Sequence, residues 1–186
     1  MRRTTPFLLL VCLALTACGP ASNTSRPTTQ PTTKPTDDER KYPPCHPGCF
    51  PKGTLVATPS GPREIQAVGK GEIVTIITAD GEVTTGPVES VFETCNRLLD
   101  LTTDAGTLRT TETQPLCLAA GGFAEAGKLK AGDRIWKCAD GKRAAVTVNG
   151  VNPVDGTSAV FNLVVGTDKV FVANGFLARG KPPVDH

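Results

Sequence analysis

A series of Asp-Gly and Asn-Gly pairs separates short runs rich in valine, isoleucine and threonine, and this pattern constrains the fold more than any other feature. Such pairs between β-branched runs are the strongest short-range signal for β-hairpins. No long window shows the 3.6-residue apolar period of an amphipathic helix. We therefore predict an all-β fold of short strands and hairpins. The expected hairpins join 72–78 to 82–85 at Asp80-Gly81 and 98–103 to 107–111 at 104–106, further strands cover 145–148 and 160–165, and further turns lie at Asp140-Gly141, Asn149-Gly150, Asp155-Gly156 and Asn174-Gly175.

The composition argues against several classes of function. A length of 186 residues allows one ordinary domain with tails. Lys and Arg total 20 against 18 Asp and Glu, which implies no basic face for nucleic acid. The chain has two histidines, His46 and His186, and both lie in expected tails. This placement argues against a histidine-based metal centre or a Ser-His-Asp triad in the domain, and no cofactor or metal is expected.

The N-terminus has the pattern of an export signal. Residues 1–17 combine two arginines with the apolar run 7–15, which is too short to span a bilayer. The sequence Leu15-Thr16-Ala17-Cys18 resembles the bacterial lipobox, so we expect cleavage before Cys18 and lipidation of its thiol with acyl chains such as palmitate. This predicts an exported, membrane-anchored lipoprotein on an outer membrane or cell surface, facing the periplasm or exterior. The alternative is an ordinary secretory signal followed by a chance cysteine.

The next segment differs in composition from the rest. Residues 19–44 hold six prolines and six threonines and no leucine, isoleucine, valine or phenylalanine. Such a segment buries too little apolar surface to fold. We therefore expect a lipidated, disordered tether over 18–48, a folded domain over 49–181 and a short tail over 182–186. The lipid makes the membrane the expected partner, and the sequence identifies no protein partner.

The cysteine count points to a leftover thiol. Of seven cysteines, Cys12 leaves with the signal and Cys18 takes the lipid. Five remain in an oxidising setting, so at most two disulfides form and at least one thiol is left over. That thiol is either a candidate nucleophile or a buried, inert group. The five are Cys45, Cys49, Cys95, Cys117 and Cys138, and the sequence does not choose their pairing.

A weak internal repeat suggests two similar halves. Residues 68–74 and 129–135 share an apolar residue, two intervening positions, a Gly-acid pair and a β-branched residue. In each copy the Gly-acid pair is expected to form a turn into a strand. Two copies are too few for a solenoid, and they are consistent with a pseudo-symmetric β domain.

The run Gly48-Cys49-Phe50-Pro51 resembles the start of the Hint domain, the self-processing module of Hedgehog proteins and inteins. The resemblance covers about residues 49–180, which is most of the mature chain, and it is the order and spacing of its pieces that make it specific. It implies a pseudo-symmetric Hint-type β fold. The further matching stretches are 65–74, 108–116, 122–135, 161–165 and 170–177.

The resemblance also implies a reaction. In the family the first cysteine attacks the preceding carbonyl and turns the peptide bond into a thioester, which here places the cleavage between Gly48 and Cys49. Thr111 matches the threonine of the family's Thr-x-x-His motif, and Gln114 stands where the histidine belongs. Glutamine donates hydrogen bonds but delivers no proton, so the acyl shift should be slow. Glu112 and Asp168 are candidate substitutes by sequence alone.

The C-terminal end departs from the family further. Inteins end in His-Asn followed by Cys, Ser or Thr, and the matching stretch here is 178–181. Arg179 replaces the histidine and Gly180 the asparagine, and Lys169 stands near another histidine position. Splicing is therefore not expected. What remains is at most single-turnover autoproteolysis with Cys49 as the nucleophile, ended by hydrolysis or by transfer to another nucleophile.

Three alternatives stay open at this stage. The first is a catalytically degenerate Hint scaffold that acts as a binding or structural module; a Cys45–Cys49 disulfide would block the thiol in that case. The second is a module that releases a toxin payload, which the short tail after Gly180 disfavours. The third is zinc binding by Cys45, His46 and Cys49, whose spacing fits no known zinc motif.

Overall fold

The computed structural model describes residues 48–139, 141–167 and 169–181, and it confirms the all-β prediction. The described residues form strands and two three-residue 3₁₀ turns, η1 and η2. No helix within this part of the chain is long and apolar enough to cross a membrane. The elements are β1 (Phe50–Pro51), β2 (Leu55–Val56), β3 (Arg63–Glu64), η1 (Ile65–Ala67), β4 (Ile73–Ile77), β5 (Val83–Pro87), β6 (Ser90–Thr103), β7 (Gly106–Thr111), β8 (Pro115–Cys117), β9 (Phe123–Glu125), η2 (Ala126–Lys128), β10 (Arg134–Ala139), β11 (Lys142–Val164), β12 (Val170–Ala173) and β13 (Phe176–Arg179).

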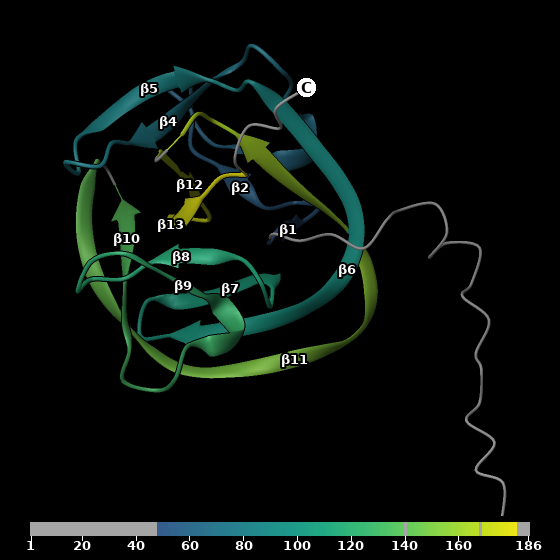
Figure 1. Cartoon of the computed structure of the whole chain (residues 1–186), viewed down its shortest axis with the longest axis vertical. Coiled ribbons are helices and arrows are strands. Elements are labelled where there is room, and N and C mark those ends of the chain that lie inside the picture. Colours follow the sequence, from purple (N-terminus) through teal and green to yellow (C-terminus); the bar gives the residue numbers. More distant parts are fainter. Residues whose placement is uncertain (1–47, 140, 168, 182–186) are drawn as a thin grey trace, which may run out of the picture. The chain divides into compact units, whose positions relative to one another are not determined.

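Two long antiparallel strands, β6 and β11, frame the domain. They pair from Thr103 with Val148 to Ser90 with Val164, and Figure 1 shows both curving around the shorter strands. Their ladder continues through β10 on one side and β7 on the other, in the order β3-β2-β12-β13-β10-β11-β6-β7. The apolar side chains enclosed by these strands form the main core, which includes Phe50, Leu101 and Phe171.

Two predicted turns are wrong because they lie inside β11. The Asn149-Gly150 and Asp155-Gly156 pairs coincide with register shifts between β11 and β6 and do not reverse the chain. A β-bulge inserts an extra residue, and glycine with its positive φ serves a bulge as readily as a turn. Gly156 has φ +82°. The expected runs 145–148 and 160–165 are therefore parts of one bent strand.

The predicted hairpin turns are confirmed elsewhere. Gly81 joins β4 to β5 with φ +84°, and Gly106 follows the turn between β6 and β7 with φ +113°. Asn174 and Gly175 join β12 to β13, and both have positive φ, as a type I′ turn requires. Asp140 lies outside the described residues, and Gly141 next to it has φ +71°.

The internal repeat corresponds to two similar substructures. In each copy a 3₁₀ turn leads through a positive-φ glycine into a strand, β4 after η1 and β10 after η2. Gly71 donates to the carbonyl of Val88 over 2.7 Å, and Gly132 donates to that of Val148 over 2.9 Å. The same local sequence therefore builds the same turn twice, which is the predicted pseudo-symmetry.

Candidate functional site

The peptide bond between Gly48 and Cys49 is buried where β1 meets β11. Phe50 pairs with Phe161 of β11, and the Cys49 side chain directly before β1 has no exposed surface. A Cβ atom added to Gly48 would lie 1.9 Å from Cα of Gln114. No side chain fits at position 48, so glycine is required there for steric reasons.

A tight turn delivers Thr111 and Gln114 to this bond. The backbone N–H of Gln114 donates to the carbonyl of Thr111 over 3.1 Å, so the three-residue spacing of the motif is the spacing of a turn. The Cys49 N–H donates to Oγ1 of Thr111 over 2.8 Å. The Cys49 carbonyl accepts from the Thr111 N–H over 3.0 Å and from Oγ1 of Thr110 over 2.9 Å. These contacts fix the nitrogen side of the bond.

Asn162 of β11 holds the carbonyl side, and sequence reasoning missed it. Its Nδ2 donates to the Gly48 carbonyl oxygen and, over 3.2 Å, to Oε1 of Gln114. Its Oδ1 accepts from the Leu163 N–H over 2.7 Å, which orients the amide with its NH₂ group toward Gly48. One signal was available: Asn162 is the single polar residue in the apolar run 160–165, and a buried amide needs partners.

Gln114 is fully buried, and its side-chain amide forms hydrogen bonds that hold neighbouring segments together. Its Nε2 donates to the carbonyl oxygens of Pro115 and Arg179, each over 3.0 Å, while its Oε1 accepts from Asn162. Both amide hydrogens therefore point at backbone carbonyls. Gln114 links the end of β13 to the junction and does not stand as a donor to the Cys49 nitrogen.

The structure brings Gly48, Cys49, Thr111 and Gln114 into one site, whereas Glu112 lies at the surface. The Glu112 side chain is exposed and packs over Gly127, where an added Cβ would lie 2.2 Å from its Cγ. Its geometry gives no support to a role as a substitute acid or base. Asp168 and the expected lipidation residue Cys18 lie outside the described residues.

The C-terminal residues 180–181 lie against β11 next to Asn162. The Lys181 N–H donates to the Leu163 carbonyl over 2.9 Å. A Cβ atom on Gly180 would lie 2.6 Å from that carbonyl oxygen, so an asparagine at this position requires the backbone to move. The Arg179 guanidinium lies 5.2 Å from the ring centroid of Phe123. The Arg179 side chain thus packs on an aromatic ring, and Gly180 lies where a larger residue would meet the backbone.

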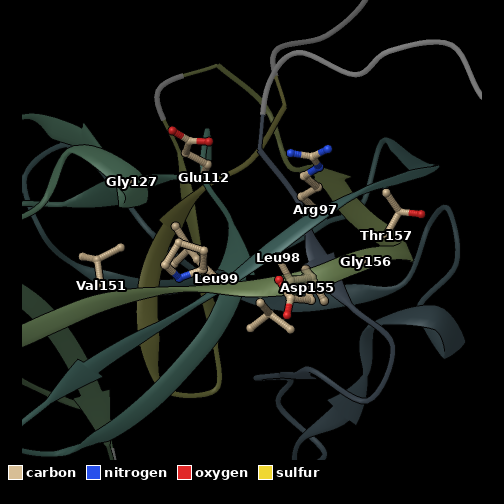
Figure 2. Close-up of a pocket in the computed structure, with 11 residues that line it drawn as sticks. Arg97, Leu98, Leu99, Glu112, Gly127, Val151, Asp155, Gly156 and Thr157 are labelled. Atoms are coloured by element: carbon tan, nitrogen blue, oxygen red, sulfur yellow. The ribbon is translucent and has the colours of Figure 1, made fainter. Parts of the chain in front are cut away.

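A hollow of about 750 Å³ lies beside the site, along the β-bulge of β11 between Val154 and Thr157, opposite β6. Figure 2 shows Val151 toward one end of it and Thr157 toward the other. Leu98 and Val154 line this hollow and also pack in the small apolar cluster that contains Cys49 and Val160. Leu98 therefore belongs both to the wall of the hollow and to the surroundings of the thiol.

The other cysteines differ in environment. No disulfide joins any two of the four cysteines within residues 48–181 that the structure describes. Burial raises the pKa of Cys117 to about 12, with Arg143 lowering it slightly. Cys45 and His46 lie outside the described residues, so the proposed Cys45–Cys49 disulfide and the zinc alternative fall there too. Across the described ranges no three His, Cys, Asp or Glu side chains cluster as metal ligands do.

Comparison with known proteins identifies the fold. No family model matches the chain, and no curated protein matches its sequence. Among solved structures it is similar to an Ssp DnaB mini-intein variant at 19% identity and TM-score 0.66, over 74% of this chain and 97% of that one. A DnaB intein from Synechocystis sp. PCC 6803 matches at 19% identity and TM-score 0.66, over 72% and 99%. A bacterial intein-like domain from Clostridium thermocellum matches at 24% identity and TM-score 0.62, over 72% and 98%. The all-β domain therefore has the Hint fold of inteins, as the resemblance predicted.

Proposed function

We propose that this Hint-fold domain cleaves its own chain once, between Gly48 and Cys49, through an N–S acyl shift. The observation that carries the proposal is that both ends of this peptide bond are held. Asn162 donates to the Gly48 carbonyl oxygen, and Oγ1 of Thr111 accepts from the Cys49 N–H. When the thiol of the next residue attacks a glycyl carbonyl, negative charge develops on the carbonyl oxygen. A side-chain donor already positioned at that oxygen stabilises this charge.

The chemistry follows from these contacts. The Cys49 sulfur attacks the Gly48 carbonyl carbon, and negative charge develops on the oxygen that Asn162 already contacts. The C–N bond breaks as the C–S bond forms, and the proton lost by the thiol ends on the Cys49 amine. The thioester is then resolved by water, which leaves a carboxylate on Gly48 and a thiol on Cys49.

The reaction should be slow. The side chains of Thr111 and Asn162 bond the Gly48–Cys49 peptide unit, and both are neutral at physiological pH. A positioned general acid or base typically contributes about 10²–10⁴-fold to the rate. Gln114 donates to two backbone carbonyls and therefore supplies no proton to the leaving nitrogen.

The same amide supports a second candidate function. Because Gln114 ties Arg179 to the junction, it favours a stable, uncut scaffold that acts as a binding or structural module. In either case we propose that the domain is carried by an exported, lipid-anchored chain, on the pattern of residues 1–18. Cleavage would separate the anchored residues 18–48 from residues 49–186, whereas the scaffold would stay tethered.

The deciding experiment follows the intact mass of the full chain, purified in detergent, over days at neutral pH with reductant. Hydroxylamine is added to trap thioesters. We expect the wild type to yield a fragment that begins at Cys49, and Cys49→Ala to stay full length. Cys95→Ala is the matched cysteine control and should be cut like the wild type. An uncut wild type under every condition would leave the scaffold function as the conclusion.

A further inference from the structure

Lys181 is the only charged side chain among the buried residues of the described chain, with 7% of its surface exposed. A lysine is rarely this buried unless it is paired or has a special role. The contacts of its backbone and of its ammonium group place it at the Gly48–Cys49 site.

The backbone of Lys181 lies on the strand that carries Asn162. β6 covers one edge of β11, where Leu163 pairs with Val91. Along the other edge β1 pairs at Phe161, and two residues further on the Leu163 carbonyl accepts from the Lys181 N–H over 2.9 Å. The first strand of the domain, β1, and the backbone of Lys181 therefore bond to neighbouring positions on the same edge of β11.

The ammonium group lies on the face of the sheet that holds the junction. Nζ of Lys181 is 3.0 Å from the ring centroid of Phe92. Phe92 is the direct cross-strand partner of Asn162, and such partners share a face with Cβ atoms about 4.5–5.5 Å apart. Phe92 also packs against the cluster that contains Cys49. One aromatic ring thus adjoins the lysine nitrogen, the amide that bonds Gly48 and the surroundings of the thiol.

We propose that Lys181 is the acceptor of the acyl group, so that the domain forms an isopeptide bond between Gly48 and its own Lys181. This inference rests on the proposed acyl shift. In the step, Nζ gives its ammonium proton to water and attacks the thioester carbonyl carbon of Gly48, a C–N bond forms and the C–S bond breaks. The proton that leaves the nitrogen goes to the sulfur and restores the Cys49 thiol. The product is an isomer of the starting chain, and no further reactant is needed.

Position favours the lysine over water. An amine of the same chain on the same face of the sheet as the carbonyl reacts as an intramolecular nucleophile, with a high effective concentration. The resulting amide is stable, whereas the thioester is labile. The product would carry residues 18–48 on the side chain of Lys181 and would have a free α-amino group on Cys49. The domain would thus stay attached to the tether through its other end.

The test uses the full chain in detergent and three readouts. Labelling by 2-cyanobenzothiazole reports a Cys49 with both amine and thiol free, intact mass separates isomer from fragment, and digestion followed by mass spectrometry seeks a Gly48–Lys181 cross-linked peptide. We expect the wild type to give a labelled species with the mass of the uncut chain that resists hydroxylamine. Lys181→Arg keeps the charge on Phe92 but lacks the acceptor, and it should give only the fragment 49–186. Lys169→Arg is the matched lysine control.

The outcomes are distinguishable. A wild type that yields only the free fragment, or a Lys181→Arg variant that still yields the full-mass labelled species, would overturn the role of Lys181 and leave self-cleavage intact. A wild type and a folded Lys181→Arg variant that both lack any labelled Cys49 would overturn the acyl shift and this inference with it. Coincident thermal unfolding of the wild type and the variant verifies that the substitution preserves the fold.

Discussion

Nδ2 of Asn162 donates a hydrogen bond to the carbonyl oxygen of Gly48, a residue 114 positions earlier in the chain. This contact joins the long strand β11 to the residue before β1. It aims a neutral donor at the oxygen on which charge would develop if Cys49 attacked. The rate of any acyl shift should therefore depend strongly on Asn162.

Asn162→Ala tests that dependence. Removing one preorganised donor of this kind typically lowers the rate of acyl transfer by about 10²–10³-fold. We expect a loss of this size in hydroxylamine-trapped fragment per hour. Thr102→Ala, which removes a bond to the Gly150 carbonyl on the same pair of strands, serves as the control and should leave the rate unchanged. Equal rates for the wild type and Asn162→Ala would contradict the assigned role.

Gln114→His should accelerate cleavage. It places a titratable group at the end of the turn that presents Thr111 to the Cys49 nitrogen. A positioned general acid contributes about 10²–10⁴-fold, and we expect a gain toward the lower end because the bonds to Pro115 and Arg179 are disturbed. The measurement is the cleavage rate against pH, where the variant should gain a dependence in the range in which histidine titrates. The Cys49→Ala, Gln114→His double variant should remain whole.

Gly48→Ala should destabilise the domain. Its Cβ would lie 1.9 Å from Cα of Gln114, a backbone atom that has no room to move away. Overpacking of this kind typically costs about 1–3 kcal/mol. The free energy of unfolding, from urea titration, is the quantity to compare. Gly69→Ala is the matched control because an added Cβ there meets nothing within 4 Å, and it should unfold like the wild type.

Cys117 should resist alkylation in the folded protein. Burial raises its pKa from 9.0 to about 12, so at pH 8 it stays a thiol, and the thiolate is the reactive form. Between pH 9 and 12 the folded state keeps the Cys117 proton, whereas the unfolded state has lost it. The contribution of Cys117 to the free energy of unfolding is therefore complete below pH 9 and declines as the pH rises toward 12. Iodoacetamide labelling at pH 8 with and without guanidinium checks this. Fast labelling of Cys117 without denaturant would contradict it.

Leu98→Ala should expose Cys49 to reagents. Leu98 lines the hollow beside the site and packs in the cluster that contains Cys49. Replacing a buried leucine by alanine typically costs about 2–5 kcal/mol, and here it also extends the hollow toward the thiol. We expect faster iodoacetamide labelling of Cys49 under conditions where the fold persists by circular dichroism. Val151→Ala shortens another side chain of the same hollow, one packed against the main core, and should not change the labelling.

The local parts of this fold could be read from the sequence, and the long-range parts could not. Asp80-Gly81 and Asn174-Gly175 set their turns through their own backbone preferences. The same kind of pair at Asp155-Gly156 forms a bulge, because the strand beside it decides the outcome.

A similar division applies to the site. Cys49, Thr111 and Gln114 were found by motif, and the structure brings them together. Asn162 belongs to no motif of this kind, and Lys181 lies in the C-terminal stretch 178–181 without a role assigned from the sequence. Their placement depends on which residues of β6 and β1 lie beside β11, and that register is a property of the whole sheet.

The entry of the chain at β1 and the backbone of Lys181 are fastened to one edge of β11, two residues apart. Tension along the expected tether would therefore be borne by the few edge hydrogen bonds at Phe161 and Leu163, ahead of the enclosed core. If the chain were held to a membrane at one end and to a partner at the other, β1 and the segment at Lys181 would detach from this edge of β11 first. Because the Gly48–Cys49 bond lies there, its geometry would be the first to respond to load.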